Sequence, residues 1–365
     1  MNVIASLTNP NLHEKPDHVS DRLIAGISLM TGMIVALFFA VAMVMAKPAY
    51  AADACGGTNL LATLTDKTLL AKIDTEAALI PNGNGILWRI RKNGLPDSFL
   101  FGTMHVSDPR VLNLPVKVQT AFDAAQSLVI ETTDVLDPAK ASAAMMKRPE
   151  LMMFTDGSNL EQLIPAKDLS MVNAALTKRG MPLAAVKTIK PWMLAAMLAT
   201  PACEASRKAG GIEILDISLA TRAKAAGKPV KGLETMEEQI SAMASLPMKD
   251  HINGLVETLR MGDVSDDVFE TMLALYAKGD TARIMPSLGA ALEAITGEEG
   301  KMDLEAQAQF EEKLITNRNT IMVARLPEHL AQGGAFVAIG ALHLPGKLGV
   351  IQQMREAGYE MEAVK

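Results

Sequence analysis

The sequence carries two copies of the pattern Gly-x-x-His, each directly after an apolar run. Gly102 and His105 follow the run FLF, and Gly340 and His343 follow the run AFVAI. Each imidazole is therefore expected just beyond the end of a buried strand, where α/β sheets build their sites. Glycine at such a place lets the backbone turn or approach a ligand closely. Two copies among six histidines predict a functional pair, and the alternative is a pair of hydrogen-bonded core histidines.

Two acidic residues stand at comparable positions. Glu131 closes the apolar run SLVIE, and Glu234 follows the run KPVKGL. An ionised carboxylate at the end of a buried strand is costly unless it is paired or binds a metal. The alternative for Glu131 is a strand-end acid that simply reaches solvent. For Glu234 it is an ordinary acid in the first turn of a helix, which the helix dipole favours.

One basic residue completes the set. Arg318 precedes Asn319 in the segment NRNTIM, late in a stretch with helical spacing. A buried guanidinium there can donate to a carboxylate or to a developing oxyanion. A surface arginine on a helix is the alternative.

Two imidazoles and a carboxylate together predict a site for a divalent cation. Neutral imidazole and carboxylate suit zinc, manganese, cobalt or iron, and three protein ligands leave positions open for water and substrate. Such a cation makes bound water a nucleophile, with a spare glutamate as base and an arginine to stabilise charge. The sequence lacks H-E-x-x-H, C-x-x-C, G-x-S-x-G, P-loop and G-x-G-x-x-G motifs, so the spacing does not identify the metal and other common enzyme classes lack support.

The residues between these positions predict an α/β (α+β) fold, in which a mixed central sheet carries a large helical insertion. Short apolar or alternating runs predict strands, and Asn93-Gly94 predicts the turn of a hairpin. Two blocks, about 137–201 and 236–328, are rich in Ala, Leu, Met, Glu and Lys at helical spacing. The strands are expected at 86–92, 97–102, 127–132, 228–232, 335–340 and 359–364, and the helices that join them at 116–126, 214–226 and 348–356.

The N-terminal part differs from the rest of the chain. An uncharged apolar stretch over residues 24–46 is followed by Ala49 and Ala51 in the A-x-A pattern of signal-peptide cleavage. We therefore expect residues 1–51 to be a signal peptide and residues 52–365 to be an exported, periplasmic domain. The alternative is an uncleaved anchor, which would leave the domain facing the periplasm and would be its only contact with the membrane.

Charge and cysteine content limit the possible partners. With 35 basic and 41 acidic residues, the chain does not offer the basic surface that nucleic-acid binding needs. Cys55 and Cys203 are its two cysteines. In an oxidising, exported compartment we expect them to form a disulfide, with two free thiols as the alternative.

Several blocks of the sequence resemble one family, TraB/GumN (also TraB/PrgY/GumN), which is related to the Tiki metalloproteases. The resemblance extends from about residue 55 to residue 364, and it implies a sheet of the erythromycin-esterase/ChaN-like type. It places the family's two Gly-x-x-His motifs at the two motifs above, its acid at Glu131, its LET glutamate at Glu234, and its RN pair at Arg318 and Asn319. The blocks that carry it are LWRIRKNGLPDSFLFGTMHVSDPRV, LVIETTD, ILDISLATRAKAAGKPVKGLETMEEQ, NRNTIM, FVAIGALHLPGKLGV and GYEMEAV.

The resemblance and the residues together predict an exported metal-dependent hydrolase of the peptidase type, with a peptide or protein as substrate. We expect His105, Glu131 and His343 to bind manganese, cobalt or zinc, while Glu234 and Arg318 act as base and as charge or carboxylate partner. A second hypothesis is a periplasmic binding or regulatory protein that holds a peptide or polysaccharide in the same pocket without turnover. A third is a module that binds heme.

Overall fold

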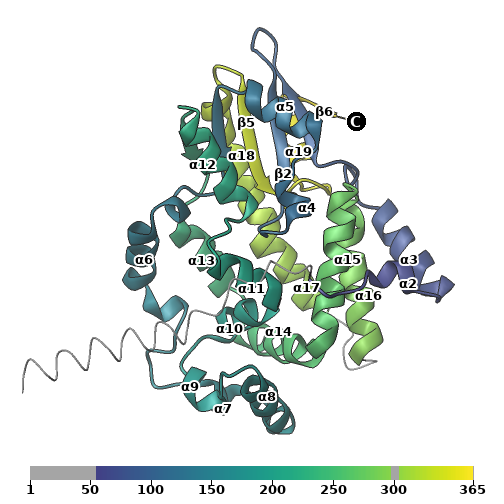
Figure 1. Cartoon of the computed structure of the whole chain (residues 1–365), viewed down its shortest axis with the longest axis vertical. Coiled ribbons are helices and arrows are strands. Elements are labelled where there is room, and N and C mark those ends of the chain that lie inside the picture. Colours follow the sequence, from purple (N-terminus) through teal and green to yellow (C-terminus); the bar gives the residue numbers. More distant parts are fainter. Residues whose placement is uncertain (1–54, 297–303, 365) are drawn as a thin grey trace, which may run out of the picture. The chain divides into compact units, whose positions relative to one another are not determined.

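The computed structural model describes residues 55–296 and 304–364 (Figure 1). The chain divides into two units, Met1–Ala52 and Asp53–Lys365, and the described residues belong to the second. The predicted signal peptide or anchor, residues 1–51, lies outside the described residues. Among the residues described, no helix combines the length and the apolar character that crossing a bilayer requires.

The centre of the unit is a six-stranded mixed sheet with the strand order β4-β3-β5-β2-β1-β6. Strands β4, β3, β5 and β2 run parallel, whereas β1 is antiparallel to both β2 and β6. This confirms a mixed α/β fold, and all six expected strands are present. Their bounds are Leu87–Arg91 (β1), Ser98–Thr103 (β2), Ser127–Ile130 (β3), Val230–Gly232 (β4), Ala335–Gly340 (β5) and Glu360–Ala363 (β6).

Strand β5 lies in the middle of the parallel part and is apolar along its length. Ala335 to Ile339 are all buried, as expected for a parallel strand covered on both faces. Strands β1 and β2 form the predicted hairpin, with Leu87 opposite Phe101. Its turn contains Gly94 at φ +79°, a conformation that glycine adopts without strain.

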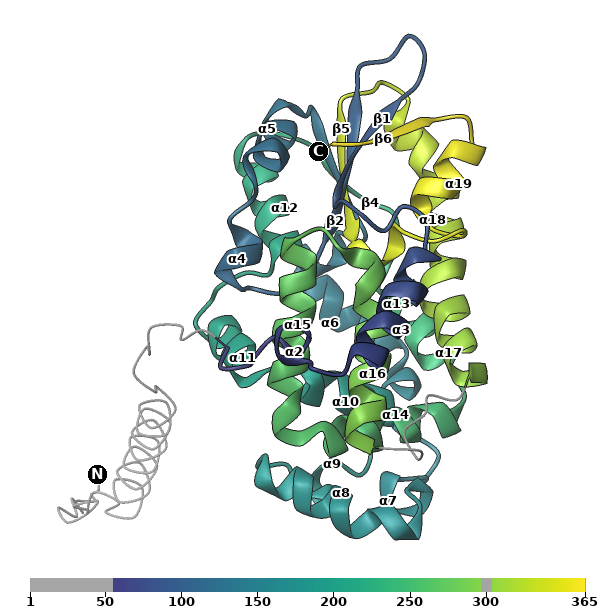
Figure 2. The ribbon, with the colours of Figure 1, turned by 90° about the vertical axis from the view of Figure 1, so that its right-hand side faces the viewer.

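Helices cover both faces of the sheet, and each face has its own apolar core. Helices α5 (Val116–Ala124) and α12 (Leu215–Ala225) pack on the face that carries Phe336. Helices α18 (Asn317–Leu330) and α19 (Val350–Glu356) pack on the opposite face, which carries Val337. Figure 2 shows these two pairs on either side of the sheet.

The other helices lie mainly beyond one end of the sheet (Figures 1 and 2). The described residues of the blocks 137–201 and 236–328 carry helices and no strand of the sheet, while their status as an inserted unit stays a prediction. A π-helical segment, Glu311–Thr316, leads directly into α18. The α-helices other than α5, α12, α18 and α19 are α2 (Leu60–Thr63), α3 (Lys67–Ala78), α4 (Pro109–Leu112), α6 (Pro138–Lys147), α7 (Leu160–Leu163), α8 (Ala166–Lys178), α9 (Leu183–Val186), α10 (Pro191–Ala199), α11 (Ala202–Ala209), α13 (Met236–Ala244), α14 (Met248–Met261), α15 (Ser265–Ala277), α16 (Ile284–Thr296) and α17 (Leu304–Phe310).

The two cysteines form a disulfide, which confirms the expectation from the sequence. Cys55 and Cys203 have Cα atoms 5.4 Å apart. The bond ties the first described residue of the chain to helix α11, which begins at Ala202.

Gly102 is required by close packing and not by its backbone angles. A Cβ atom at Gly102 would lie 3.0 Å from Cα of Ala341 and 3.0 Å from Cδ2 of Leu344. Both residues belong to the segment that follows β5. The absent side chain thus lets the ends of β2 and β5, with the two Gly-x-x-His motifs, approach each other.

We expect Gly102→Ala to lower the free energy of unfolding by roughly 1–3 kcal/mol, because the added methyl group must displace the turn after β5. Urea denaturation measures the change. The matched control is Gly254→Ala in α14, where a Cβ atom meets nothing within 4 Å and alanine favours the helix by up to about 1 kcal/mol. Equal stability of the two variants would contradict the packing argument.

Candidate functional site

The predicted site residues meet at one edge of the sheet because three parallel strands end there. Strand β5 pairs with β2 on one side and with β3 on the other. His105 lies two residues after β2, Glu131 directly after β3, and His343 at the end of the 3₁₀ turn Ala341–His343 that follows β5. Residues 26, 212 and 238 positions apart in the sequence are thus brought to the carboxyl ends of adjacent strands.

The three side chains surround the space above Gly340. A Cβ atom there would lie 3.1 Å from Oε1 of Glu131, 3.3 Å from Cδ2 of His343 and 3.6 Å from Nε2 of His105. The distance between His105 Nε2 and Glu131 Oε1 is 3.8 Å. Gly340 has φ −51°, a value that any residue adopts, so the space among the three groups explains glycine here better than the backbone does.

His105 is oriented by an acid that the sequence analysis did not identify. Its Nδ1 lies 2.7 Å from Oδ2 of Asp216, in the first turn of α12. The other carboxylate oxygen of Asp216 accepts a hydrogen bond of 2.7 Å from the hydroxyl of Thr103. Because a carboxylate only accepts, the imidazole donates from Nδ1, and Nε2 is directed at Glu131.

Asn319 orients His343 in the same way. The amide nitrogen of Asn319 donates to the carbonyl oxygen of Leu348 at 2.9 Å, which fixes the direction of the amide group. Its oxygen lies 2.7 Å from Nδ1 of His343, so this imidazole also donates from Nδ1. Both histidines thus have the arrangement of metal-binding histidines, in which one ring nitrogen is held by an acceptor and the other is left to bind.

Glu131 is buried and is contacted by groups from three segments. Its Oε1 accepts a 2.6 Å hydrogen bond from the backbone N–H of Gly340. Its Oε2 accepts hydrogen bonds from Arg318 at 2.8 Å and from the side-chain amide of Gln239 at 3.0 Å. The carboxylate is therefore fixed in place, and 7% of the residue is exposed.

Arg318 also binds Glu234. Its Nη2 and Nε donate to the two carboxylate oxygens of Glu234 at 2.6 and 3.0 Å. Arg318 thus joins the two glutamates, and Gln239 contacts both of them. In this arrangement Glu234 is connected to Glu131 through Arg318. Its role as a base stays a prediction.

The backbone explains how these last residues reach the site. Arg318 and Asn319 lie in the first turn of helix α18, which directly follows the π-helical segment Glu311–Thr316. π-Helical turns frequently occur at functional sites. Glu234 and Gln239 flank the capping box of α13, in which Thr235 and Glu238 cap each other. The start of α18 therefore positions Arg318 and Asn319, and the start of α13 positions Glu234 and Gln239.

The electrostatic environment gives the two histidines different pKa values. Burial lowers the pKa of His343, and the positive charge of Arg318 contributes, so that it falls to about 4. Burial also lowers the pKa of His105, but the charge and hydrogen bond of Asp216 and the charge of Glu131 raise it to about 9. Since 53% of the His105 side chain is accessible to solvent, the Asp216 contact rather than burial determines its protonation.

The pKa of Glu131 is lowered to about 2. Burial alone would raise it, but the two histidines, Arg318 and the backbone N–H of Gly340 outweigh that effect. At neutral pH the site thus holds an ionised carboxylate and, in His343, a neutral imidazole, which is the form that binds metals.

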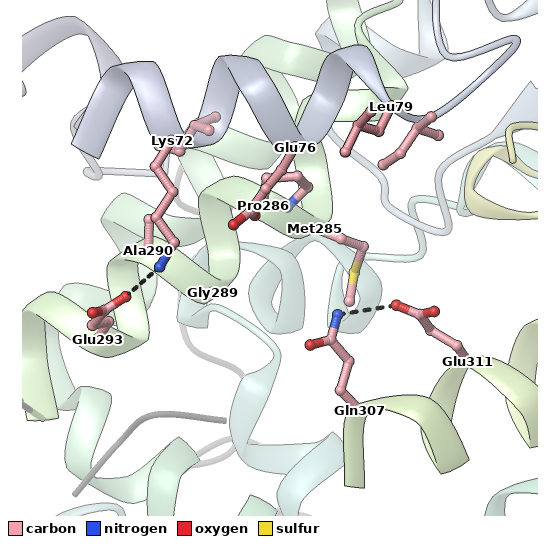
Figure 3. A pocket seen from close by; sticks show the side chains of 12 residues that line it. Lys72, Glu76, Leu79, Met285, Pro286, Gly289, Ala290, Glu293, Gln307 and Glu311 are labelled. Carbon is pink, nitrogen blue, oxygen red and sulfur yellow. Dashed lines mark hydrogen bonds and ion pairs between the residues drawn. The ribbon is translucent and has the colours of Figure 1, made fainter. Parts of the chain in front are cut away.

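Two cavities are lined in part by residues of this site. A cavity of about 340 Å³ reaches Asn319 and Leu342, and one of about 260 Å³ borders Glu234 and Arg318. A larger cavity of about 550 Å³ lies between α3, α16 and α17. Figure 3 shows two pairs across its lining, Lys72 with Glu293 and Gln307 with Glu311. None of its lining residues belongs to the site.

Comparisons with known proteins relate most of the chain to one family. Residues 86–363 match the family model described as "TraB/PrgY/gumN family". The chain is 27% identical to a protein of Nematostella vectensis named "Metalloprotease TIKI homolog", over 78% of this chain and 68% of that protein. It is 25% identical to "Metalloprotease TIKI2" of Danio rerio and 26% identical to "Metalloprotease TIKI1" of Homo sapiens. These two matches cover 76% of this chain and less than two thirds, 61% and 62%, of the relatives. No solved structure matches the chain.

We expect Asp216→Asn to bring the pKa of His105 in the metal-free protein down from about 9 to roughly 7 or lower, because the variant removes the charge that stabilises the imidazolium. An NMR titration of the imidazole Cε1–H signals measures this. His251, which contacts the carbonyl oxygen of Met243 instead, is the internal control and is expected to be unchanged. A His105 titration that is the same in both proteins would show that Asp216 does not determine its protonation.

Proposed function

Since this chain belongs to the TraB/PrgY/gumN family, we propose that it is a metal-dependent hydrolase that acts on peptides. The relatives named metalloproteases support both the reaction class and the presence of a metal. We propose further that the protein is exported to the periplasm and that its sheet is of the erythromycin-esterase/ChaN-like type.

The observation that carries the proposal is the convergence of His105, Glu131 and His343 above Gly340. Nε2 of His105, Oε1 of Glu131 and Cδ2 of His343, the ring atom next to its Nε2, border the same space. Each imidazole is held from behind by an acceptor on its Nδ1. This donor set suits a transition metal better than calcium or magnesium, which favour oxygen ligands. We therefore propose manganese, cobalt or zinc as the cofactor.

A divalent cation bound there would activate water and polarise a substrate carbonyl group. The protein residues hold the site ready for this. Asp216 and Asn319 fix the two ring orientations, and the Gly340 N–H fixes one oxygen of Glu131. Arg318 stands beside Glu131 with a guanidinium that is paired to Glu234, so it can stabilise negative charge that develops next to the site.

We expect the purified protein to bind close to one equivalent of manganese, cobalt or zinc, and His105→Ala and His343→Ala to lose most of it. Each variant removes one of three ligands. Elemental analysis after loading and dialysis measures the content. His251→Ala is the matched control, because His251 is buried in α14 away from the site. Equally low metal content in the wild type and in both site variants would exclude the metal site.

We expect a diverse peptide library to be cleaved by the metal-loaded protein. Activity should disappear with a chelator and return with added metal. Glu131→Gln should reduce cleavage by at least about 100-fold, because it removes the charged ligand that also pairs with Arg318. Mass spectrometry of the library identifies the products. If the protein holds its metal and cleaves no peptide, the peptidase assignment is wrong and a binding protein is the remaining interpretation.

A further inference from the structure

The segment that follows His105 is held by a cluster of buried charged groups. Both the backbone N–H and the hydroxyl of Ser107 donate to Oε2 of Glu204, each at 2.7 Å. Ser107 is 0% exposed and Glu204 is 1% exposed. Glu204 lies in the first turn of α11, 97 residues away in the sequence. Two residues beyond a proposed metal ligand, the backbone is thus fixed by a single carboxylate.

Arg207 links this carboxylate to the next residue of the same segment. Its Nη1 donates to Oε1 of Glu204 at 2.6 Å, and its Nη2 lies 3.5 Å from Oδ2 of Asp108. Asp108 also caps α4, where it accepts from the backbone N–H of Arg110 at 2.9 Å. Arg207 is 2% exposed, so these two acids compensate a buried charge.

The disulfide closes this cluster. Cys203 directly precedes Glu204, and Nη1 of Arg207 lies 3.5 Å from Sγ of Cys55. Cys55, Asp108 and Glu204 offer ligand atoms within 4.8 Å of one another, but the Cys55 sulfur is engaged in the disulfide and Arg207 supplies the positive charge. The cluster is therefore a structural device and not a second metal centre.

We infer that Glu204, held in place by Arg207 and by the Cys55–Cys203 disulfide, is a positioning residue for His105. This inference rests on the proposed metal site, since its consequence for function is that breaking the disulfide weakens metal binding through His105. The other histidine has no such dependence: His343 is oriented from α18 by Asn319, and Asn319 is held by Leu348. The disulfide is thus expected to act on one ligand of the site and not on the other.

The first arm of the experiment measures mobility in the purified full-length protein. A phosphine reduces the disulfide to two thiols, is itself oxidised to the phosphine oxide with oxygen from water, and is then removed under nitrogen. Hydrogen exchange is followed by mass spectrometry, and a thiol assay confirms the reduction. We expect peptides that cover residues 104–108 to exchange at least about 10-fold faster, and peptides that cover residues 340–344 to change little.

The second arm measures cobalt binding by the visible spectrum of the bound ion. We expect the dissociation constant to rise by about 10-fold or more after reduction, and likewise in Glu204→Gln and in the double variant Cys55→Ser with Cys203→Ser, because groups that orient a ligand typically contribute that much to affinity. The reduced wild type is included because it has already folded, whereas the variants must fold without the bond or the charge.

Asp168→Asn is the matched control. Asp168 in α8 is also buried and pairs with Arg260 at 2.7 Å, away from His105, so its loss is expected to lower stability without either local effect. Unchanged exchange at residues 104–108 after verified reduction would overturn the inference, and so would an equal rise throughout the protein. If the wild type binds no cobalt, the proposed function fails, while the exchange arm still decides whether the cluster positions His105.

Discussion

The carboxylate of Glu131 is the group on which the site depends. It follows strand β3, accepts a hydrogen bond from the backbone N–H of Gly340 at the end of β5, and pairs with a guanidinium from α18. A buried carboxylate without partners would cost several kcal/mol, so these contacts stabilise one arrangement of the three segments. The strand order β3-β5-β2 then places the two histidines beside the same carboxylate. The arrangement of the sheet and the position of the proposed ligands are therefore set together.

The sheet supplies the groups that face the site, and the helices supply the groups that orient them. Asp216 comes from α12, which packs on one face of the sheet, and Asn319 comes from α18, which packs on the other. Both helices also bury apolar residues, such as Leu219 and Met322, in the adjacent cores. The hydrogen bonds that orient the histidines are consequently anchored by packing, which gives them fixed geometry without long flexible side chains.

The sequence predicted the strands and the proximity of His105, Glu131 and His343, because apolar runs ending in Gly, His or Glu are local patterns. It did not identify Asp216 or Gln239. Each lies in a helix that begins next to a strand, and each acts through a contact with a residue more than 100 positions away, which periodicity does not encode. The contact of Glu204 with Ser107 was missed for the same reason. The one available hint was an acid, Asp216, at a position that α12 buries.

The charges around Glu131 explain how an arginine could lie beside the proposed metal site. Glu131, Glu234 and Asp216 bring three negative charges and Arg318 brings one positive charge. With both imidazoles neutral, as metal binding through them requires, these groups have the formal charge −2. A divalent cation would neutralise it. Without Glu234, the guanidinium of Arg318 would cancel the charge of Glu131, and less negative charge would remain to attract the cation. Glu234 thus favours metal binding from a distance, by pairing with Arg318, even though it does not face the space above Gly340.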